Sequence, residues 1–301
     1  MTPLIALTAL ALDVAIGWPD ALFRRIGHPV SWLGRLIAAL DRRWNRGCAG
    51  MARGAAAALV VIAAAVIPAL ILQGLLGPLV AGLLAWPLVA ARSLHHHLRA
   101  VARPLAAGDL QGARRATAKI VGRDVSRADA PALARASIES LAENASDGVV
   151  APLFWAAVAG LPGIAAYKAI NTLDSMIGHR TPRHAEFGRF AARLDDAANW
   201  APARLTALLF TCVAGGTAWR TARRDARAHR SPNAGWPEAA MAGALGLRLS
   251  GPRIYGGRVA EEPWLNGAGR DPVAADIARA LAICRRALWL GAGLLTLLSA
   301  I

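Results

Sequence analysis

The sequence predicts an all-α, polytopic helical membrane protein with about four to six membrane segments, one of them re-entrant, joined by long polar helical loops. Three observations favour this fold class. Hydrophobic residues make up 55% of the 301 residues, the mean hydropathy is +0.39, and apolar stretches alternate with Arg-rich ones. Such values are more typical of helical membrane proteins than of soluble globules. We expect residues 1–301 to form a single membrane-embedded domain.

The first expected element is a short apolar helix from Thr2 to Ile16, which lacks the basic start of a cleavable signal peptide. The first two membrane segments are expected from Gly54 to Leu76 and from Leu79 to Ala91. Gly77-Pro78 between them is a turn signal, so these two segments are predicted to form a helical hairpin. Pro87 is expected to kink the short second arm.

The third predicted membrane segment runs from Val149 to Ile170 and is interrupted by Gly160-Leu161-Pro162-Gly163. The break leaves two arms of about eleven residues, and a bilayer core needs about 20 helical residues to cross. We therefore predict a re-entrant hairpin, which returns the polar residues on either side of the segment to one membrane face. The last two segments are expected from Ala201 to Trp219 and from Ala287 to Ile301.

The positive charge of the chain bears on its topology. The sequence contains 34 Lys and Arg against 19 Asp and Glu, a net charge of +15, and Arg is densest in residues 17–53, 92–148 and 220–286. The positive-inside rule places those three stretches in the cytoplasm if every later segment crosses. A re-entrant third segment breaks this agreement unless another segment, such as Ala201 to Trp219, also fails to cross. Nucleic-acid binding is not expected, because the arginines are dispersed and mixed with acids.

Three short acid-and-amide clusters lie beside or between the apolar segments. A carboxylate at mid-bilayer depth costs about 2.5 to 3.5 kcal/mol, so such residues usually face a polar interior and are usually functional. A phosphate- or metal-handling site is therefore the first hypothesis. The clusters consist of Glu143, Asn144 and Asp147; of Asn171 and Asp174; and of Asp195, Asp196 and Asn199.

The first cluster has the spacing of one helical turn. Glu143 and Asn144 precede Asp147 by four and three residues, so all three would project from one face of a helix. Two carboxylates and an amide are oxygen ligands that can hold Mg²⁺ and direct it at phosphate oxygens. The alternative is helix capping by Asn144 or Ser146 ahead of the apolar run.

The other two clusters follow similar logic. Lys168, Asn171 and Asp174 are spaced by three residues along one side of a helix, which favours a phosphate contact for Lys168. The alternative is a lysine that pairs with charge at the membrane edge. Adjacent Asp195 and Asp196 point to different helical faces, so at most one of them joins a given cluster while the other can pair with a cation.

Six motifs are distributed over nearly the whole chain: HPVSWLGRLI (28–37), IVGRD (120–124), ENASDGVVAPLF (143–154), YKAINTLDSMIGH (167–179), RLDDAANWAPARL (193–205) and SPNAGWPEAAMAGALGLRL (231–249). Taken in this order, they resemble the CobD/CbiB family of cobalamin biosynthesis, the membrane-bound adenosylcobinamide-phosphate synthases. The chain departs from the family at Gly17-Trp18-Pro19, where Gly-Asp-Pro is common, and at Val125, where Thr is usual.

The resemblance implies an ATP-dependent amide ligase that joins adenosylcobyric acid to (R)-1-amino-2-propanol O-phosphate, or a related amino alcohol, and gives adenosylcobinamide phosphate. It implies ATP and Mg²⁺ as cofactors, the corrinoid and the amino-alcohol phosphate as substrates, and no nucleic-acid partner. It also implies a multi-pass protein of the bacterial inner membrane, in contact with lipid and with other membrane enzymes of the late corrin pathway.

Within that scheme each cluster receives a role. Glu143 or Asp174 would deprotonate the attacking ammonium, and Lys168 would contact phosphate at the reacting centre. The expected Mg²⁺ ligands are Asp147, Asp195 and Asp196. The other expected substrate or phosphate contacts are Arg123, Asp124, Asn144, Asn171, Arg193, Asn199, Ser231, Asn233 and Glu238.

Two alternatives remain open. One is a Mg²⁺-dependent intramembrane prenyl- or phosphotransferase, which would be expected to carry Asp-rich motifs of one repeating pattern. The other is a non-catalytic membrane scaffold or transporter, which would be expected to show inverted internal repeats. Neither pattern is evident in the sequence.

Overall fold

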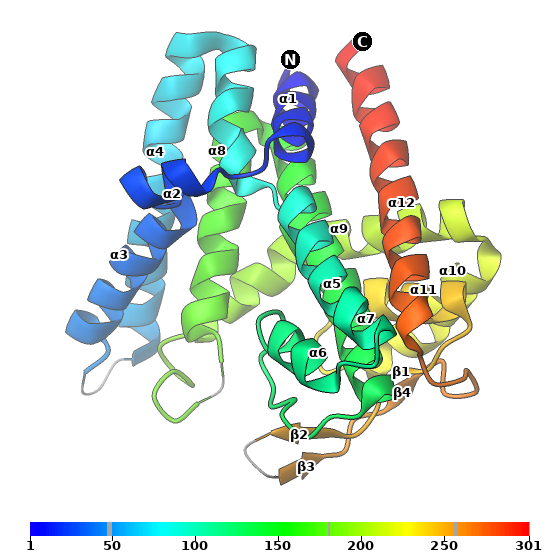
Figure 1. Ribbon diagram of the computed structural model, residues 1–301. Helices are drawn as coiled ribbons and strands as arrows, with labels where there is room; N and C mark the ends of the chain where they lie inside the picture. The colour runs from blue at the N-terminus through cyan, green and yellow to red at the C-terminus, as the bar shows by residue number, and fades with distance from the viewer. Residues whose placement is uncertain (47–49, 180, 256–257, 301) are drawn as a thin grey trace. The chain divides into compact units, whose positions relative to one another are not determined.

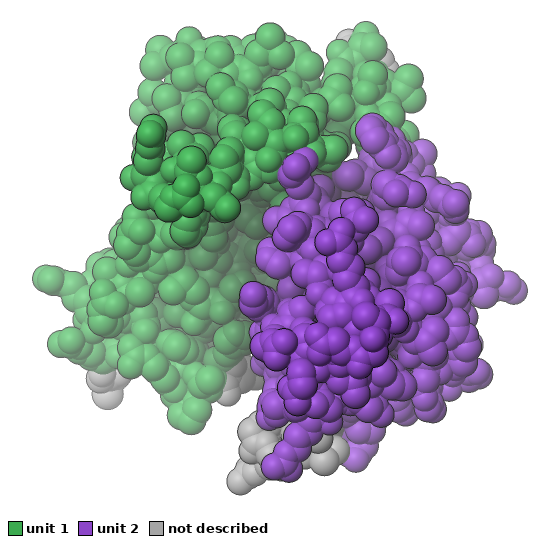
Figure 2. Space-filling model, in the orientation of Figure 1, with its two compact units in different colours: residues 1–90, 151–199, 292–301 green, residues 91–150, 200–291 purple. Residues whose placement is uncertain are grey.

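The computed structural model describes residues 1–46, 50–179, 181–255 and 258–300, and most of them are helical (Figure 1). This confirms the predicted helical fold class, while the single-domain organisation stays a prediction. The chain divides into two compact units, which are described separately (Figure 2). Unit 1 comprises Met1–Ala90, Ala151–Asn199 and Ala292–Ile301, and unit 2 comprises Ala91–Val150 and Trp200–Gly291.

Unit 1 is built from two helical hairpins with further helices packed on them. Helix α1 confirms the predicted short N-terminal helix, and α4 approaches it closely at Gly82, where a Cβ atom would lie 2.5 Å from the Thr8 Cβ. The elements are α1 (Thr2–Ala15), α2 (Asp20–Ile26), α3 (Pro29–Trp44), α4 (Gly50–Ala85), the 3₁₀ turn η1 (Trp86–Leu88), α8 (Ala151–Ile177), the first part of α9 (Arg189–Ala214) and the last part of α12 (Ala274–Ala300).

The first hairpin is α4, as predicted. Gly77 has φ 72° and ψ 176°, so the helix reverses there, and Figure 1 shows its two arms running side by side in opposite directions. The predicted kink at Pro87 is wrong, because the helix already ends at Ala85 and Pro87 lies in the short turn η1. The ring fixes φ and removes the N–H, so the α-helix does not continue past it.

The second hairpin is α8, and its break lies at the predicted place. Gly160 has φ 67° and ψ −148°, outside the helical region. The N–H of Leu161, which begins the second arm, donates to Oε1 of Gln73 at 2.6 Å. Trp155 in the first arm belongs to the same apolar cluster as Tyr167 in the second. The fold-back is thus confirmed, while its re-entrance into a membrane stays a prediction.

Three stretches of the described chain are long and apolar enough to span a membrane, 50–106, 130–177 and 274–300, and a fourth results if the bent pair formed by α1 and residues 20–44 counts as one. The predicted segment Ala201 to Trp219 is wrong as a continuous helix, because Gly215, with φ 99°, separates α9 from α10. The predicted segment Ala287 to Ile301 belongs to the longer helix α12, and Ile301 itself lies outside the described residues.

Unit 2 has its own core. Leu98, Leu133, Ile138 and Met241 lie fully buried in one apolar cluster. Two short antiparallel strand pairs, β1 with β4 and β2 with β3, follow α11. The elements are α5 (Ala91–Ala106), α6 (Leu110–Thr117), α7 (Ala130–Ala145), the π-helix η2 (Ser146–Val150), the rest of α9, α10 (Gly216–Asp225), η3 (Ala226–Ala228), α11 (Gly235–Leu245), β1 (Leu249–Ser250), β2 (Arg253–Tyr255), β3 (Arg258–Ala260), β4 (Trp264–Leu265) and the first part of α12.

Candidate functional site

The α8 hairpin of unit 1 holds the start of α9 and its acidic cluster. Tyr167, which is 1% exposed, donates its hydroxyl to Asn199 Oδ1 at 2.9 Å. Asn199 Nδ2 in turn donates to Asp195 Oδ2 at 3.0 Å. From the other arm of the hairpin, Trp155 Nε1 donates to the carbonyl oxygen of Ala198 at 3.0 Å. Both arms therefore fix the turn of α9 that carries Asp195.

Asp195 lies in a strongly negative environment. Burial, together with the charges of Asp174 and Asp196, raises the pKa of Asp195 to about 7. Hydrogen bonds from Asn199 and Asn171 act in the opposite direction. The Asn171 bond is long, 3.5 Å from Nδ2 to Asp195 Oδ1. A cation bound beside these carboxylates would offset part of this shift and favour the ionised form of Asp195.

The second arm of α8 carries Lys168, Asn171 and Asp174, each partly buried. Their spacing places them along one side of this arm, as the sequence predicts. Lys168 is also within electrostatic range of His28, which precedes α3 and whose Nδ1 accepts the N–H of Val30 at 3.2 Å. Unit 1 thus brings together two of the three predicted clusters and the predicted lysine.

Asp195 and Asp196 face different directions, as expected of adjacent helical residues. Asp195 is buried, whereas Asp196 and Arg193 are exposed. Among the residues that the structure describes, no group of three His, Cys, Asp or Glu side chains is placed to hold a metal ion. Mg²⁺ is commonly held by one or two carboxylates together with phosphate oxygens and water. The donors of unit 1 therefore fit Mg²⁺ as a partner of a bound phosphate.

The first predicted cluster lies in unit 2 and does not form one α-helical turn. Glu143 and Asn144 are exposed near the end of α7, whereas Asp147 is partly buried in the π-helix η2. The prediction of one regular α-helical turn is wrong because a π-helix begins at Ser146, while a common face for the three side chains stays a prediction. The capping alternative is also wrong, since Asn144 Nδ2 donates back to the carbonyl oxygen of Ser140 at 2.8 Å and Ser146 lies at the C-terminal end of α7.

Arg123 takes part in a buried network that the sequence analysis missed. Its Nη2 lies 3.0 Å from Glu139 Oε2, and Glu139 Oε1 accepts the N–H of Ser250 at 2.8 Å. Glu139 is only 5% exposed. An acidic residue within the apolar run of α7 was the sequence signal that could have predicted this network. Asp124, also predicted, is exposed and accepts the N–H of Ser126 at 2.8 Å. Glu139 therefore joins α7 to β1, and Arg123 pairs with its charge in addition to any contact with substrate.

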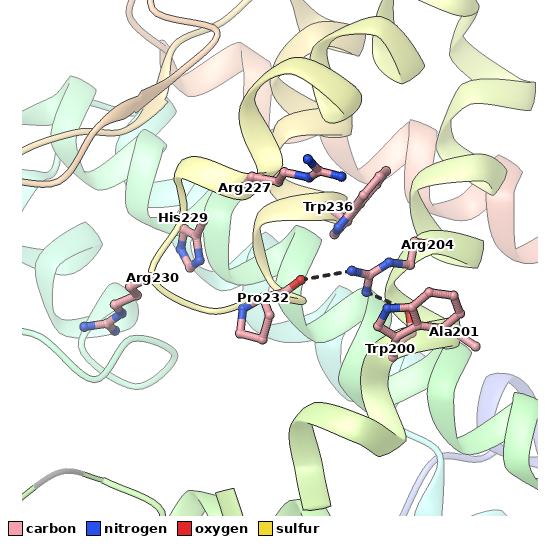
Figure 3. A pocket seen from close by; sticks show the side chains of 8 residues that line it. All are labelled: Trp200, Ala201, Arg204, Arg227, His229, Arg230, Pro232 and Trp236. Atoms are coloured by element: carbon pink, nitrogen blue, oxygen red, sulfur yellow. Dashed lines mark hydrogen bonds between the residues drawn. The ribbon is translucent and has the colours of Figure 1, made fainter. Parts of the chain in front are cut away.

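Unit 2 also contains a pocket of about 740 Å³ (Figure 3). The Arg204 guanidinium lies between two indole rings, 4.8 Å from the ring centroid of Trp200 and 4.9 Å from that of Trp236. It donates to Asn233 Oδ1 at 2.8 Å and to the carbonyl oxygen of Pro232 at 3.3 Å. The lining residues are Trp200, Ala201, Arg204, Arg227, His229, Arg230, Pro232 and Trp236.

The three residues predicted in this part of the chain support the pocket. Asn233 holds Arg204, and Glu238 Oε1 lies 3.6 Å from His229 Nε2, with both side chains buried. Ser231 Oγ accepts the N–H groups of Asn233 and Ala234 at 3.3 and 3.2 Å, which shapes the turn before α11. The arginines and tryptophans that line the pocket were not predicted as site residues, although two of the quoted motifs contain Trp200, Arg204 and Trp236.

The fold and the site define a helical protein with membrane-spanning candidates and a buried acidic cluster at a helical hairpin. Comparison with known families identifies it further. The model of the family described as CobD/Cbib protein matches residues 6–284, and the chain belongs to this family.

Relatives resemble the chain over most of their length. A protein of Rhodobacter capsulatus named "Cobalamin biosynthesis protein CobD" is 62% identical over 288 residues, covering 93% of this chain and 92% of the relative. Proteins of the same name from Sinorhizobium fredii (strain NBRC 101917 / NGR234) and Rhizobium meliloti (strain 1021) are 46% and 49% identical. They cover 94% and 89% of this chain, and 93% and 87% of the relatives. No solved structure matches the chain.

Proposed function

We propose that this protein is a membrane enzyme of cobalamin biosynthesis, an ATP-dependent ligase. It would join adenosylcobyric acid to (R)-1-amino-2-propanol O-phosphate, or a related amino alcohol, through an amide bond. Membership of the CobD/Cbib family and the names of its relatives support the pathway. The observation that supports the chemistry is the buried Asp195, set among Asp174 and Asp196 at the α8 hairpin that also carries Lys168.

The reaction requires that a carboxylate be activated, because a carboxylate is a poor electrophile. Transfer of the γ-phosphate of ATP to the corrinoid carboxylate gives an acyl phosphate and ADP. The amine then attacks the acyl carbon, phosphate leaves, and one proton is lost from the attacking nitrogen. Bound Mg²⁺ would supply neutralisation of charge on the phosphate oxygens.

The residues of unit 1 suit this sequence of steps. Asp195 is proposed as a Mg²⁺ ligand, and Tyr167 and Asn199 hold it in place through their hydrogen bonds. Asp196 faces another direction, so its proposed role as a Mg²⁺ ligand lies outside this cluster. Lys168 is proposed to contact the transferred phosphate, and Asp174 to accept the proton of the attacking ammonium. A preorganised cation such as Lys168 would stabilise the negative charge of the phosphate in the transition state.

The predicted residues of unit 2 and Arg193 keep their proposed roles. Arg123 and Arg193 are proposed as phosphate contacts, Asp147 as a Mg²⁺ ligand and Glu143 as the alternative base. The apolar helices support a location in a membrane, and we propose the bacterial inner membrane with several crossings.

The test is synthesis by the purified protein in detergent, supplied with ATP, Mg²⁺, adenosylcobyric acid and aminopropanol phosphate. The proposal expects ADP and adenosylcobinamide phosphate. Asp147→Asn and Asp174→Asn should abolish synthesis without affecting membrane insertion, whereas Asp20→Asn, at an exposed acid in α2, should retain it. Full activity of both variants would show that the site is misplaced. Turnover of a prenyl diphosphate would favour the transferase alternative.

A further inference from the structure

The pocket of unit 2 contains an exposed aromatic side chain, Trp200. Trp200 is 62% exposed, although the Arg204 guanidinium lies over its ring. Arg204 is itself held by Trp236 on its other side and by three oxygen acceptors, the carbonyl oxygens of Trp200 and Pro232 and Oδ1 of Asn233. With its hydrogen bonds directed into the protein, Arg204 acts as a positioning residue. The exposed part of the Trp200 indole remains available to stack on a flat ligand.

Basic side chains line the remainder of the same pocket. Arg227, His229 and Arg230 come from one short stretch at and after η3. Figure 3 shows Arg227 directed toward the Trp236 ring, with His229 and Arg230 on the other side of Pro232. Arg230 Nη1 lies 3.6 Å from Glu262 Oε1 and forms an ion pair with this carboxylate. The cationic side chains are therefore suited to an extended anion.

The size of the pocket restricts the class of ligand. A volume of about 740 Å³ lies within the range of about 300 to 1,000 Å³ that is usual for drug-sized ligands. A nucleotide belongs to this size class, whereas a corrin macrocycle with its side chains and adenosyl group exceeds it. An aromatic ring next to arginines can bind a nucleotide, because the ring can stack on the planar base and the arginines can bind the phosphates.

We propose that this pocket binds a purine nucleotide, with the base stacked on Trp200 and the phosphates contacting Arg227 and Arg230. The choice of an adenine nucleotide rests on the proposed ligase function. The assignment adds to that function, since it gives the nucleotide a binding site in unit 2 that lacks a phosphate-binding glycine loop.

The test is equilibrium dialysis of the full-length protein in detergent with AMP-PNP, a non-hydrolysable ATP analogue. Trp200→Leu should weaken binding about 10-fold, because stacking on an aromatic residue is lost, and Trp200→Phe should restore most of it. Arg227→Gln should also weaken binding about 10-fold through the loss of a charge-assisted hydrogen bond. The matched controls are Trp289→Leu, at a tryptophan that is 66% exposed, and Arg223→Gln, at an exposed arginine one turn before Arg227.

Competition by fragments distinguishes the ligands. Adenosine should compete less well in Trp200→Leu, and inorganic triphosphate less well in Arg227→Gln. If the pocket instead binds the amino-alcohol phosphate, binding of that compound should weaken in Trp200→Leu and Arg227→Gln while AMP-PNP binding is unchanged in both variants, and this would overturn the assignment. If the wild type binds AMP-PNP and the variants bind it equally well, only this inference fails. If the wild type binds no nucleotide, the ATP-dependent function fails with it.

Discussion

Gly160→Ala tests the fold-back of α8 on which the unit 1 site depends. Gly160 adopts φ 67° and ψ −148°, near a backbone region that only glycine populates readily, and a side chain there costs about 2 kcal/mol. The new Cβ would lie 2.2 Å from Gln73 Oε1. Displacing Gln73 leaves the Leu161 N–H without its acceptor, which costs about 2 kcal/mol more. The reduced entropy of the unfolded chain offsets up to about 1 kcal/mol.

We therefore expect Gly160→Ala to lower the free energy of unfolding by about 3 kcal/mol, measured by denaturant titration in detergent. Gly74→Ala is the matched control, because Gly74 lies inside the first arm of α4 with no atom within 4 Å of its added Cβ, and it should be neutral or slightly stabilising. In a Gln73→Ala background the cost of Gly160→Ala should fall, since the clash is removed. Equal stabilities of Gly160→Ala and Gly74→Ala would refute the fold-back at this residue.

Three further perturbations test the site and the unit 2 network. The folded pKa of Asp195, about 7, lies above its ordinary value of 3.8, so the folded state binds an extra proton between these values and this contribution to stability is lost as pH rises through 7. Between pH 5 and 8 the loss amounts to about 3 kcal/mol, and Asp195→Asn should abolish it when the free energy of unfolding is measured at these two pH values; an equal change in both proteins would contradict the assigned environment. Glu139→Ala should reduce the free energy of unfolding by about 3 kcal/mol because it leaves Arg123 without its buried partner. An unchanged midpoint of chemical denaturation would argue against the network. Arg204→Lys should lower stability by about 1 kcal/mol through the loss of planar stacking, seen as a lower Tm, whereas an unchanged Tm would show that stacking contributes nothing.

The helical reversals were predictable where glycine and proline act together. Gly77-Pro78 and Gly160 with Pro162 combine a residue that permits positive φ with one that disrupts helical hydrogen bonding, and both breaks are present. Gly215 was missed because it lies in an apolar run whose hydropathy resembles that of a continuous span. The π-helix at Ser146 was missed because no residue type marks the insertion of a wider turn.

The candidate site was predictable only where its contacts are local. Asp195 and Asn199 are one turn apart, and their hydrogen bond follows from helical spacing. The hydroxyl of Tyr167, by contrast, reaches Asn199 from 32 residues away through the α8 hairpin. Likewise, Arg204 meets Asn233 across 29 residues, so the pocket depends on the packing of α9 against the turn before α11. Composition and local residue spacing do not predict contacts between residues so far apart in the sequence.

The most direct test of the central claim follows an oxygen atom through the reaction. Adenosylcobyric acid labelled with ¹⁸O in its free carboxyl group is incubated with the purified protein, Mg²⁺, ATP and aminopropanol phosphate. Activation as an acyl phosphate predicts one ¹⁸O atom in the released phosphate for each amide formed, together with one ADP, and no product from Asp174→Asn. Amide formation with the label in AMP, or no amide from the wild type, would contradict the account.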